Sequence, residues 1–368
     1  EFMPEETVMT TGLPVAFNTR IRVWGEPDDN TEGGPTISFI VDGVKKDVRE
    51  IDPEKEEQVV KFNHQFLTPG EHLAEVVLEG DNHPIDNRRK YLCTVPESFR
   101  VLILDDGAVA EDAPAAVPGG AVSGEATSSL ESSFVSLAID PPIHPGMERI
   151  SRFTSKVIPP SRVMYENLET YPLVILTQTV SLNSVLAGNL GQYVSSGGNL
   201  WIFSGPNINI YNYNKLLYKE GKGVMPCKIE KKTADSEQEN AKLVFTASTH
   251  PALSGLRGKG GADASVFRYS EVKPAEDARP VLSLEDGTPM TVERTFGRGK
   301  VLFTATTAGI GWSFFPAAPE FPLFVQSMIR YLVGNPDQAV NLETGALFRQ
   351  PVYVSKRHLL LKNPDGTK

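Results

Sequence analysis

The chain has 368 residues, of which 40% are hydrophobic and 22% are charged, a composition typical of folded globular proteins. Because this length exceeds what one hydrophobic core usually supports, we expect two domains. The formal net charge of -10 argues against attachment to nucleic acid or anionic lipid, since phosphate binding needs clustered Lys and Arg. No apolar run in the sequence approaches the roughly 20 residues that a membrane-spanning helix needs.

The ends of the sequence are typical of a fragment. No signal peptide opens the chain, and the dipeptide before Met3 is typical of a cloning remnant. Near the other end, residues 351–354 and 359–361 are predicted strands with no partner strand after them. We therefore expect an excised piece of a longer protein. The two cysteines are too few for a disulfide framework and lack the paired spacing of a zinc motif.

Apolar residues alternate with polar ones between Val15 and Val95, which predicts half-buried antiparallel strands. Turn sequences at Asp42-Gly43 and Pro69-Gly70 separate these runs, as in a small β-sandwich. Cys93 shares the inward phase of its run, so we expect a buried structural thiol. The alternating positions fall into five groups: Val15, Phe17, Ile21 and Val23; Ile37, Phe39 and Val41; Val60, Phe62 and Phe66; Ala74, Val76 and Leu78; Tyr91, Cys93 and Val95.

One stretch of this region carries a family resemblance. The turn Thr68-Pro69-Gly70-Glu71-His72, the apolar run at 76–78, and the later Asp81 and Asp86-Asn87-Arg88 resemble the CARDB-type adhesion sandwich. In that family a "PGxH" turn and a later "DN" pair recur. The resemblance implies an Ig-like β-sandwich over residues 8–97.

The pattern changes near Ser98. Residues 100–106 form a continuous apolar run that ends in Asp105 and Asp106, which is typical of a parallel strand buried on both faces. Residues 107–127 are rich in Ala, Pro, Gly and Ser and are predicted to form a loop. Ser128 and Glu131 then match a capping box for a helix that carries Leu130, Phe134 and Leu137.

Strands are predicted at 153–158, 173–177 and 200–203. Between the last two, Val185, Leu186, Leu190 and Val194 keep helical spacing, and Gly197-Gly198 ends the helix, so this segment reads as a right-handed crossover. Later elements are a meander at 281–284, 290–294 and 301–305, followed by a helix over 322–333 whose predicted buried stripe is Leu323, Phe324, Met328, Ile329 and Leu332.

Three motifs in order resemble the class I glutamine amidotransferase-like, doubly wound (flavodoxin-like) fold. They are the segments at 193–203, at 250–256, and from Gly297-Arg298-Gly299 to Trp312 and Pro316. The resemblance is to the version found in large BatA-like membrane proteins that contain a von Willebrand A domain. It implies an α/β domain over 98–335, after which residues 336–368 begin a further β segment.

The sequence lacks two parts of an amidotransferase triad, which needs a thiolate on a strand-to-helix elbow and a His base near the domain end. The elbow position reads Ser204-Gly205-Pro206-Asn207, without cysteine. No histidine occurs between His250 and His358. We therefore expect amidotransferase activity to be lost. Ser204 is a poor substitute, because a hydroxyl needs a nearby base and its surroundings do not make Gly-x-Ser-x-Gly.

Other reactive groups have structural interpretations. Cys227 lies in an alternating strand, where a buried thiol is favoured over a dyad with His250. His250 precedes Pro251 at a helix start, which favours a capping or packing role. The acidic loop at 26–30 lacks the Gly and final Glu of a calcium-binding EF-hand loop, so a solvated turn is favoured.

The carboxyl ends of parallel strands collect ligands in open α/β sheets. This rule yields one candidate pocket and assigns no catalytic residue, metal or cofactor. The candidate pocket comprises Asp105, Asp106, Gln178, Ser204, Gly205 and Asn207.

The resulting functional hypothesis is a non-catalytic interaction or scaffolding fragment of a membrane-anchored cell-envelope protein, with the extracytoplasmic side favoured and an unidentified protein partner. One alternative is a hydrolase, or a domain that binds a metal or small ligand, using Asp105 and Asp106. A second alternative is a carbohydrate-binding module, suggested by the β-sandwich and by aromatic residues expected to be exposed, such as Tyr211 and Tyr213.

Overall fold

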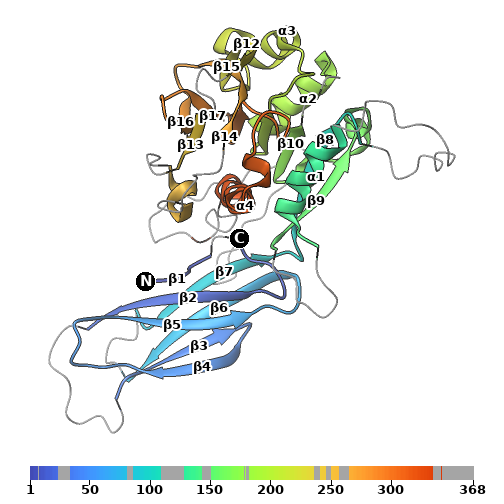
Figure 1. Ribbon diagram of the computed structural model, residues 1–368. Coiled ribbons are helices and arrows are strands. Elements are labelled where there is room, and N and C mark those ends of the chain that lie inside the picture. Colours follow the sequence, from blue (N-terminus) through green and yellow to red (C-terminus); the bar gives the residue numbers. More distant parts are fainter. Residues whose placement is uncertain are drawn as a thin grey trace.

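The computed structural model describes residues 1–6, 8–23, 34–80, 86–108, 128–142, 151–177, 179, 182–235, 241–245, 250–256, 265–334 and 341. Figure 1 shows two bodies, a β-sandwich built from the first part of the chain and an α/β domain built from the later part. Each has its own hydrophobic core.

The first body is a sandwich of two antiparallel sheets, which confirms the β-sandwich expected from the alternating pattern (Figure 1). One sheet contains β1 (Phe2–Pro4), β2 (Pro14–Arg22) and β5 (Glu57–Gln65). The other has the order β4-β3-β6-β7, with β3 (Thr36–Val41), β4 (Val44–Glu50), β6 (Gly70–Glu79) and β7 (Arg88–Val95). The aromatic centre of its core is Phe17, Phe39, Phe62 and Phe66.

Two of these strands were absent from the sequence prediction. Strand β4 is polar and almost entirely exposed, so it lacks the apolar alternation that marks the others. Strand β1 pairs with β2, and its Phe2 ring is buried 5.5 Å from the ring of Phe17. The dipeptide interpreted as a cloning remnant therefore contributes a core side chain. Cys93 is fully buried, as expected.

The second body is organised around a nine-stranded mixed sheet. Five neighbouring strands are parallel, in the order β9-β8-β10-β11-β18. Numbered along the chain this order is 2-1-3-4-5, the order of flavodoxin-like doubly wound sheets. The strands are β8 (Phe99–Asp105), β9 (Phe153–Ile158), β10 (Leu173–Thr177), β11 (Asn199–Phe203) and β18 (Gly299–Thr304).

The predicted meander is present and extends this sheet. Strand β18 pairs in parallel with β11 on one side and antiparallel with β17 on the other, so the meander continues the sheet past its parallel part. The antiparallel strands are β17 (Pro289–Phe296), β16 (Arg279–Leu284), β13 (Ala241–Val244) and β14 (Ser265–Val266). A separate ribbon pairs β12 (Cys227–Asp235) with β15 (Arg268–Pro274).

The helices of this domain are α1 (Ser128–Ile139), α2 (Ser184–Ser195), α3 (Ile210–Tyr213) and α4 (Glu320–Val333). Short helical turns are η1 (Pro160–Tyr165), η2 (Leu168–Thr170), η3 (Asn214–Tyr218), η4 (Lys219–Gly221), η5 (Pro251–Leu256) and η6 (Phe315–Ala317). As predicted, β10, α2 and β11 form a parallel crossover, and Gly197 ends α2 with a φ of 115°.

The predicted apolar stripes of the helices are partly wrong. Leu323, expected to be buried in α4, is exposed, and the helix buries Phe321 and Val325 instead. In α1, Leu137 is also exposed. The face of α1 that packs inward carries Val135, Ala138 and Ile139.

Segments at both ends of the described chain connect the two bodies. Val8 is buried in the α/β core, whereas its neighbour Met9 is buried in the sandwich core. The Asn341 side chain, beyond α4, accepts a hydrogen bond from the backbone N–H of Leu92 in β7 and donates one to its carbonyl, at 2.7 and 2.8 Å. Apart from Asn341, the segment 336–368 with its two predicted strands lies outside the described residues.

Within the part of the chain that the structure describes, no helix has both the length and the apolar character needed to cross a membrane.

Candidate functional site

The parallel strands bring most of the predicted pocket residues to one edge of the sheet. Asp105 ends β8 and is in register with Thr177 at the end of β10, and Thr177 is in register with Phe203 of β11. Asp106, Ser204 and Gly205 follow these strand ends directly. Gln178 lies outside the described residues.

Asp105 is buried and its carboxylate is used by the chain itself. One oxygen accepts a hydrogen bond from the Gly107 N–H at 2.8 Å, and the other accepts one from Thr177 Oγ1 at 3.1 Å. These two bonds hold the turn after β8 against the end of β10. The geometry therefore gives Asp105 a structural role in joining two strands.

Ser204 occupies the elbow position, but its side chain is 0% exposed. Its backbone N–H donates to the carbonyl of Thr304, and its hydroxyl lies 2.6 Å from that of Ser270. Gly205 is also buried, whereas Asn207 is exposed. The hydroxyl at the elbow is thus enclosed and hydrogen-bonded, which is the opposite of a presented nucleophile.

Cys227, at the start of β12, is 0% exposed. Burial raises the pKa of its thiol, because desolvation disfavours the thiolate. Reactive cysteines need a lowered pKa and partial exposure. The environment of Cys227 matches the buried structural thiol that the sequence predicted.

His250 lies in a buried polar cluster, which we call the Glu293 network. Its Nδ1 accepts a hydrogen bond from the N–H of Ala252 at 3.3 Å, the capping contact expected at the start of η5. Its Nε2 lies 3.3 Å from Glu293 Oε2. The other carboxylate oxygen accepts bonds from Arg279 Nε and Nη2 at 2.9 and 2.7 Å and from the hydroxyl of Tyr331 at 3.0 Å.

These hydrogen-bond donors stabilise the ionised form of Glu293. Its side chain is 3% exposed, and burial alone would raise the pKa of the carboxyl. The hydrogen bonds from His250, Arg279 and Tyr331 outweigh that effect and lower the pKa to about 2. The network ties η5, β16 and α4 to β17. A cavity of about 410 Å³ adjoins it, lined in part by His250 and Arg279.

The sequence analysis missed the Glu293 network. A signal was present, because Glu293 interrupts the apolar run Met290-Thr291-Val292 inside a predicted strand. A charged residue at such a position is rarely buried unless it is paired. Its partners come from residues 14 to 43 positions away, so their identity could not be read from local spacing.

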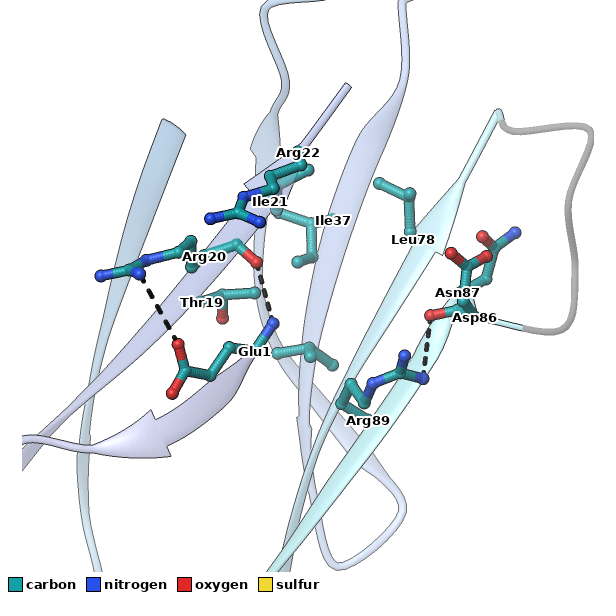
Figure 2. Close-up of a pocket in the computed structure, with 11 residues that line it drawn as sticks. Glu1, Thr19, Arg20, Ile21, Arg22, Ile37, Leu78, Asp86, Asn87 and Arg89 are labelled. Carbon is teal, nitrogen blue, oxygen red and sulfur yellow. Dashed lines mark hydrogen bonds and ion pairs between the residues drawn. The ribbon is translucent and has the colours of Figure 1, made fainter. Parts of the chain in front are cut away.

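A cavity in the sandwich domain was also missed. It has a volume of about 740 Å³ and opens between the two sheets (Figure 2). Arg20 and Arg22 come from β2 on one wall, and Arg89 comes from β7 on the facing wall. In the sequence, Arg20 and Arg22 are polar positions of the alternating pattern, which carries no signal of a cavity.

The other candidate ligand groups have mixed outcomes. Tyr211 is exposed, as the carbohydrate hypothesis requires, but Tyr213 is fully buried and donates to the carbonyl of Thr179, so its predicted exposure is wrong. The acidic loop at 26–30 lies outside the described residues. In the described ranges, no group of three or more His, Cys, Asp or Glu side chains is placed to hold a metal ion.

No protein-family model and no curated protein matches the chain. Among solved structures, a cytoplasmic protein from Salmonella typhimurium LT2 is 13% identical, with a TM-score of 0.45 over 64% of this chain and 99% of its own. A β-galactosidase from Bacillus circulans sp. alkalophilus is 13% identical, with a TM-score of 0.38 over 64% and 30%. The CARDB domain of a Pyrococcus furiosus protein, solved with di-metal ions, is 13% identical, with a TM-score of 0.21 over 26% and 83%. These similarities are too weak to carry an argument about function.

Proposed function

We propose that the chain is a non-catalytic interaction or scaffolding part of a larger cell-envelope protein, in which an amidotransferase-like domain has lost its triad. The observation that carries this proposal is the burial and hydrogen bonding of the Ser204 side chain. At the position where an amidotransferase presents its thiolate, this hydroxyl is fully enclosed and hydrogen-bonded to Ser270.

Three further observations support the proposal. Cys227 is fully buried, and its raised pKa disfavours a thiolate at neutral pH. His250 is engaged with Glu293 and the backbone of Ala252 rather than facing an open cleft at the elbow. The 2-1-3-4-5 order of the parallel strands is compatible with the flavodoxin-like scaffold that the motifs at 193–203 and 297–316 resemble.

The envelope location and the membrane anchor of the parent protein are proposed from the sequence resemblance. An adhesion-type sandwich joined to an inactive enzyme-like domain fits a role in protein contacts, because both domains then supply surfaces rather than chemistry. The partner is proposed to be a protein on the extracytoplasmic side.

The proposal is tested by incubating the purified chain with glutamine and measuring released ammonia. We expect a rate equal to that of a buffer blank for the wild type and for Cys227→Ala and Ser204→Ala alike. Glutamine turnover that disappears in either variant would overturn the proposal. A matched control, Ser196→Ala, changes a serine outside the elbow and separates a specific loss from a general effect of substitution.

A further inference from the structure

The cavity of the sandwich domain combines an apolar interior with a rim that carries charged groups of both signs. Ile37 and Val76, on adjacent strands β3 and β6, are buried and line its interior together with the half-buried Ile21 and Leu78. Arg89 of β7 lies at the rim, whereas the guanidinium groups of Arg20 and Arg22 extend away from Ile37 and Leu78 (Figure 2). A volume of about 740 Å³ lies within the range of about 300–1,000 Å³ that small-molecule sites occupy.

The arginines of the two walls differ in how their charges are balanced. Arg20 and Arg22 both face Glu57, at 3.4 and 3.2 Å, and Arg20 also approaches Glu1 at 3.9 Å. Arg89 instead donates from Nη1 to the backbone carbonyls of Asp86 and Arg88. Among the described residues no carboxylate forms an ion pair with Arg89, although the exposed Asp86 also lines the rim. The remaining N–H groups of Arg89 are therefore available to an anion.

A buried hydroxyl in the same cavity adds an independent observation. The Thr19 side chain lines the cavity and its residue is 4% exposed, yet its Oγ1 has no hydrogen-bond partner among the described residues. Buried polar groups are normally hydrogen-bonded, and an exception in a cavity points to a missing partner. The polar head group of a ligand held by Arg89 would supply the missing partner if it also reached this hydroxyl.

We propose that the sandwich domain binds a small amphipathic carboxylate, with the apolar part between the sheets against Ile37 and Val76 and the carboxylate at the rim on Arg89. The guanidinium fork of arginine matches a carboxylate in a bidentate geometry, which makes this head group a better fit than a neutral one. The apolar lining favours a hydrocarbon tail, because burying it removes apolar surface from water. This site is independent of the α/β domain and of its proposed inactivity.

The proposal is tested on the whole chain by titrating octanoate and following backbone amide signals by NMR. We expect saturable shifts at Thr19, Ile37 and Leu78. Octanol has the same tail without the charge, and acetate has the same head without the tail. Octanol is expected to bind at least tenfold more weakly, and acetate is expected to give no saturable shift.

Substitutions at two neighbouring arginines locate the binding site. Arg89→Gln is expected to weaken octanoate binding at least fivefold. Arg88→Gln is the matched control, because Arg88 pairs with Glu75 at 3.5 Å and does not line the cavity. Leu78→Trp, which fills the cavity from a half-buried position, is expected to abolish binding while the amide spectrum stays that of a folded protein.

Three results would overturn the proposal: no saturable shift with octanoate, equal affinity for octanol, or equal effects of the Arg88 and Arg89 variants. Each of these results leaves the glutamine test of the α/β domain unaffected.

Discussion

The charge of Glu293 contributes to the stability of the α/β domain. Its folded-state pKa of about 2 lies below the ordinary value of 4.5, so the carboxylate stabilises the fold above pH 4.5. That contribution is lost as the pH falls from 4.5 toward 2. The shift corresponds to about 2–3 kcal/mol, at the lower end because Arg279 is largely in solvent.

We expect Glu293→Gln to lower the free energy of unfolding at pH 7 by about 2–3 kcal/mol and to flatten the loss of stability below pH 4.5. Urea unfolding at pH 7, 5 and 3 measures both effects. Glu285→Gln is the control, because Glu285 is exposed on the rim of the adjoining cavity. If the two variants behaved alike at all three pH values, the assigned role of the Glu293 network would be wrong.

Thr19 and Thr177 are both buried threonines, but among the described residues only the hydroxyl of Thr177 has a hydrogen-bond partner. Thr177 Oγ1 donates to the Asp105 carboxylate, so Thr177→Val is expected to cost about 1–3 kcal/mol by leaving that oxygen unpaired. Thr19→Val removes a hydroxyl that has no hydrogen-bond partner in the described part of the chain, and is expected to leave the stability of the ligand-free chain unchanged or higher. Thermal unfolding of the two variants checks this. A loss of stability in Thr19→Val equal to that in Thr177→Val would contradict it.

At the scale of elements, the packing of α2 against the sheet depends on a close backbone approach. A Cβ added at Gly299, the first residue of β18, would lie 1.9 Å from the carbonyl oxygen of Gly198 and 2.6 Å from that of Val194. Both neighbours are backbone atoms, so they cannot move without shifting the end of α2. Gly188, on the exposed face of α2, has no atom within 4 Å of the same added position.

We expect Gly299→Ala to lower the free energy of unfolding by more than about 2 kcal/mol, because the clash must separate β18 from the turn after α2. Gly188→Ala is expected to raise it by about 0.5–1 kcal/mol, because alanine is the better helix former. Chemical denaturation of the pair gives the two signs. A neutral Gly299→Ala would show that this contact does not restrain the elements.

The sequence predicted elements well where burial is simple. Strands β9 and β10 match their predicted bounds, because β9 begins and ends with the apolar Phe153 and Ile158 and β10 begins with a run of four apolar residues. Strand β4 was missed because it lies at a sheet edge with polar side chains on both faces. Leu323 was placed wrongly because helical spacing gives a stripe but does not say which neighbours cover it.

The sites were less accessible from sequence than the strands. Asp105 and Ser204 were brought to one sheet edge as the topology rule requires, yet whether their polar atoms are free depends on Thr177 and Ser270, which no local pattern links to them. The sandwich cavity is lined by residues from two different sheets, such as Arg20 of β2 and Arg89 of β7. Such sites depend on tertiary pairing, whereas sequence periodicity reports only whether a residue faces inward.

At the scale of the whole molecule, the two domains share chain segments rather than meeting only through a linker. Arg152 of the α/β domain donates to the carbonyl of Pro14 at 3.3 Å, and Asn341 returns from α4 to the edge strand β7 of the sandwich. Val8 belongs to the α/β core although the sandwich strands β1 and β2 flank it in sequence. A destabilising substitution in the N-terminal segment is therefore expected to affect the α/β domain.

Val8→Ala tests this coupling against Val15→Ala, the same chemical change at a residue buried in the sandwich core. Removing two methyl groups is expected to cost about 2 kcal/mol at either site. Hydrogen exchange followed by mass spectrometry locates the effect. Val8→Ala is expected to speed exchange in peptides from β8 and β10, whereas Val15→Ala is expected to speed it in β2 and β5. If Val8→Ala changed exchange in the sandwich strands alone, the N-terminal segment would not connect the two cores, and the domains would have to be treated as independent folding units.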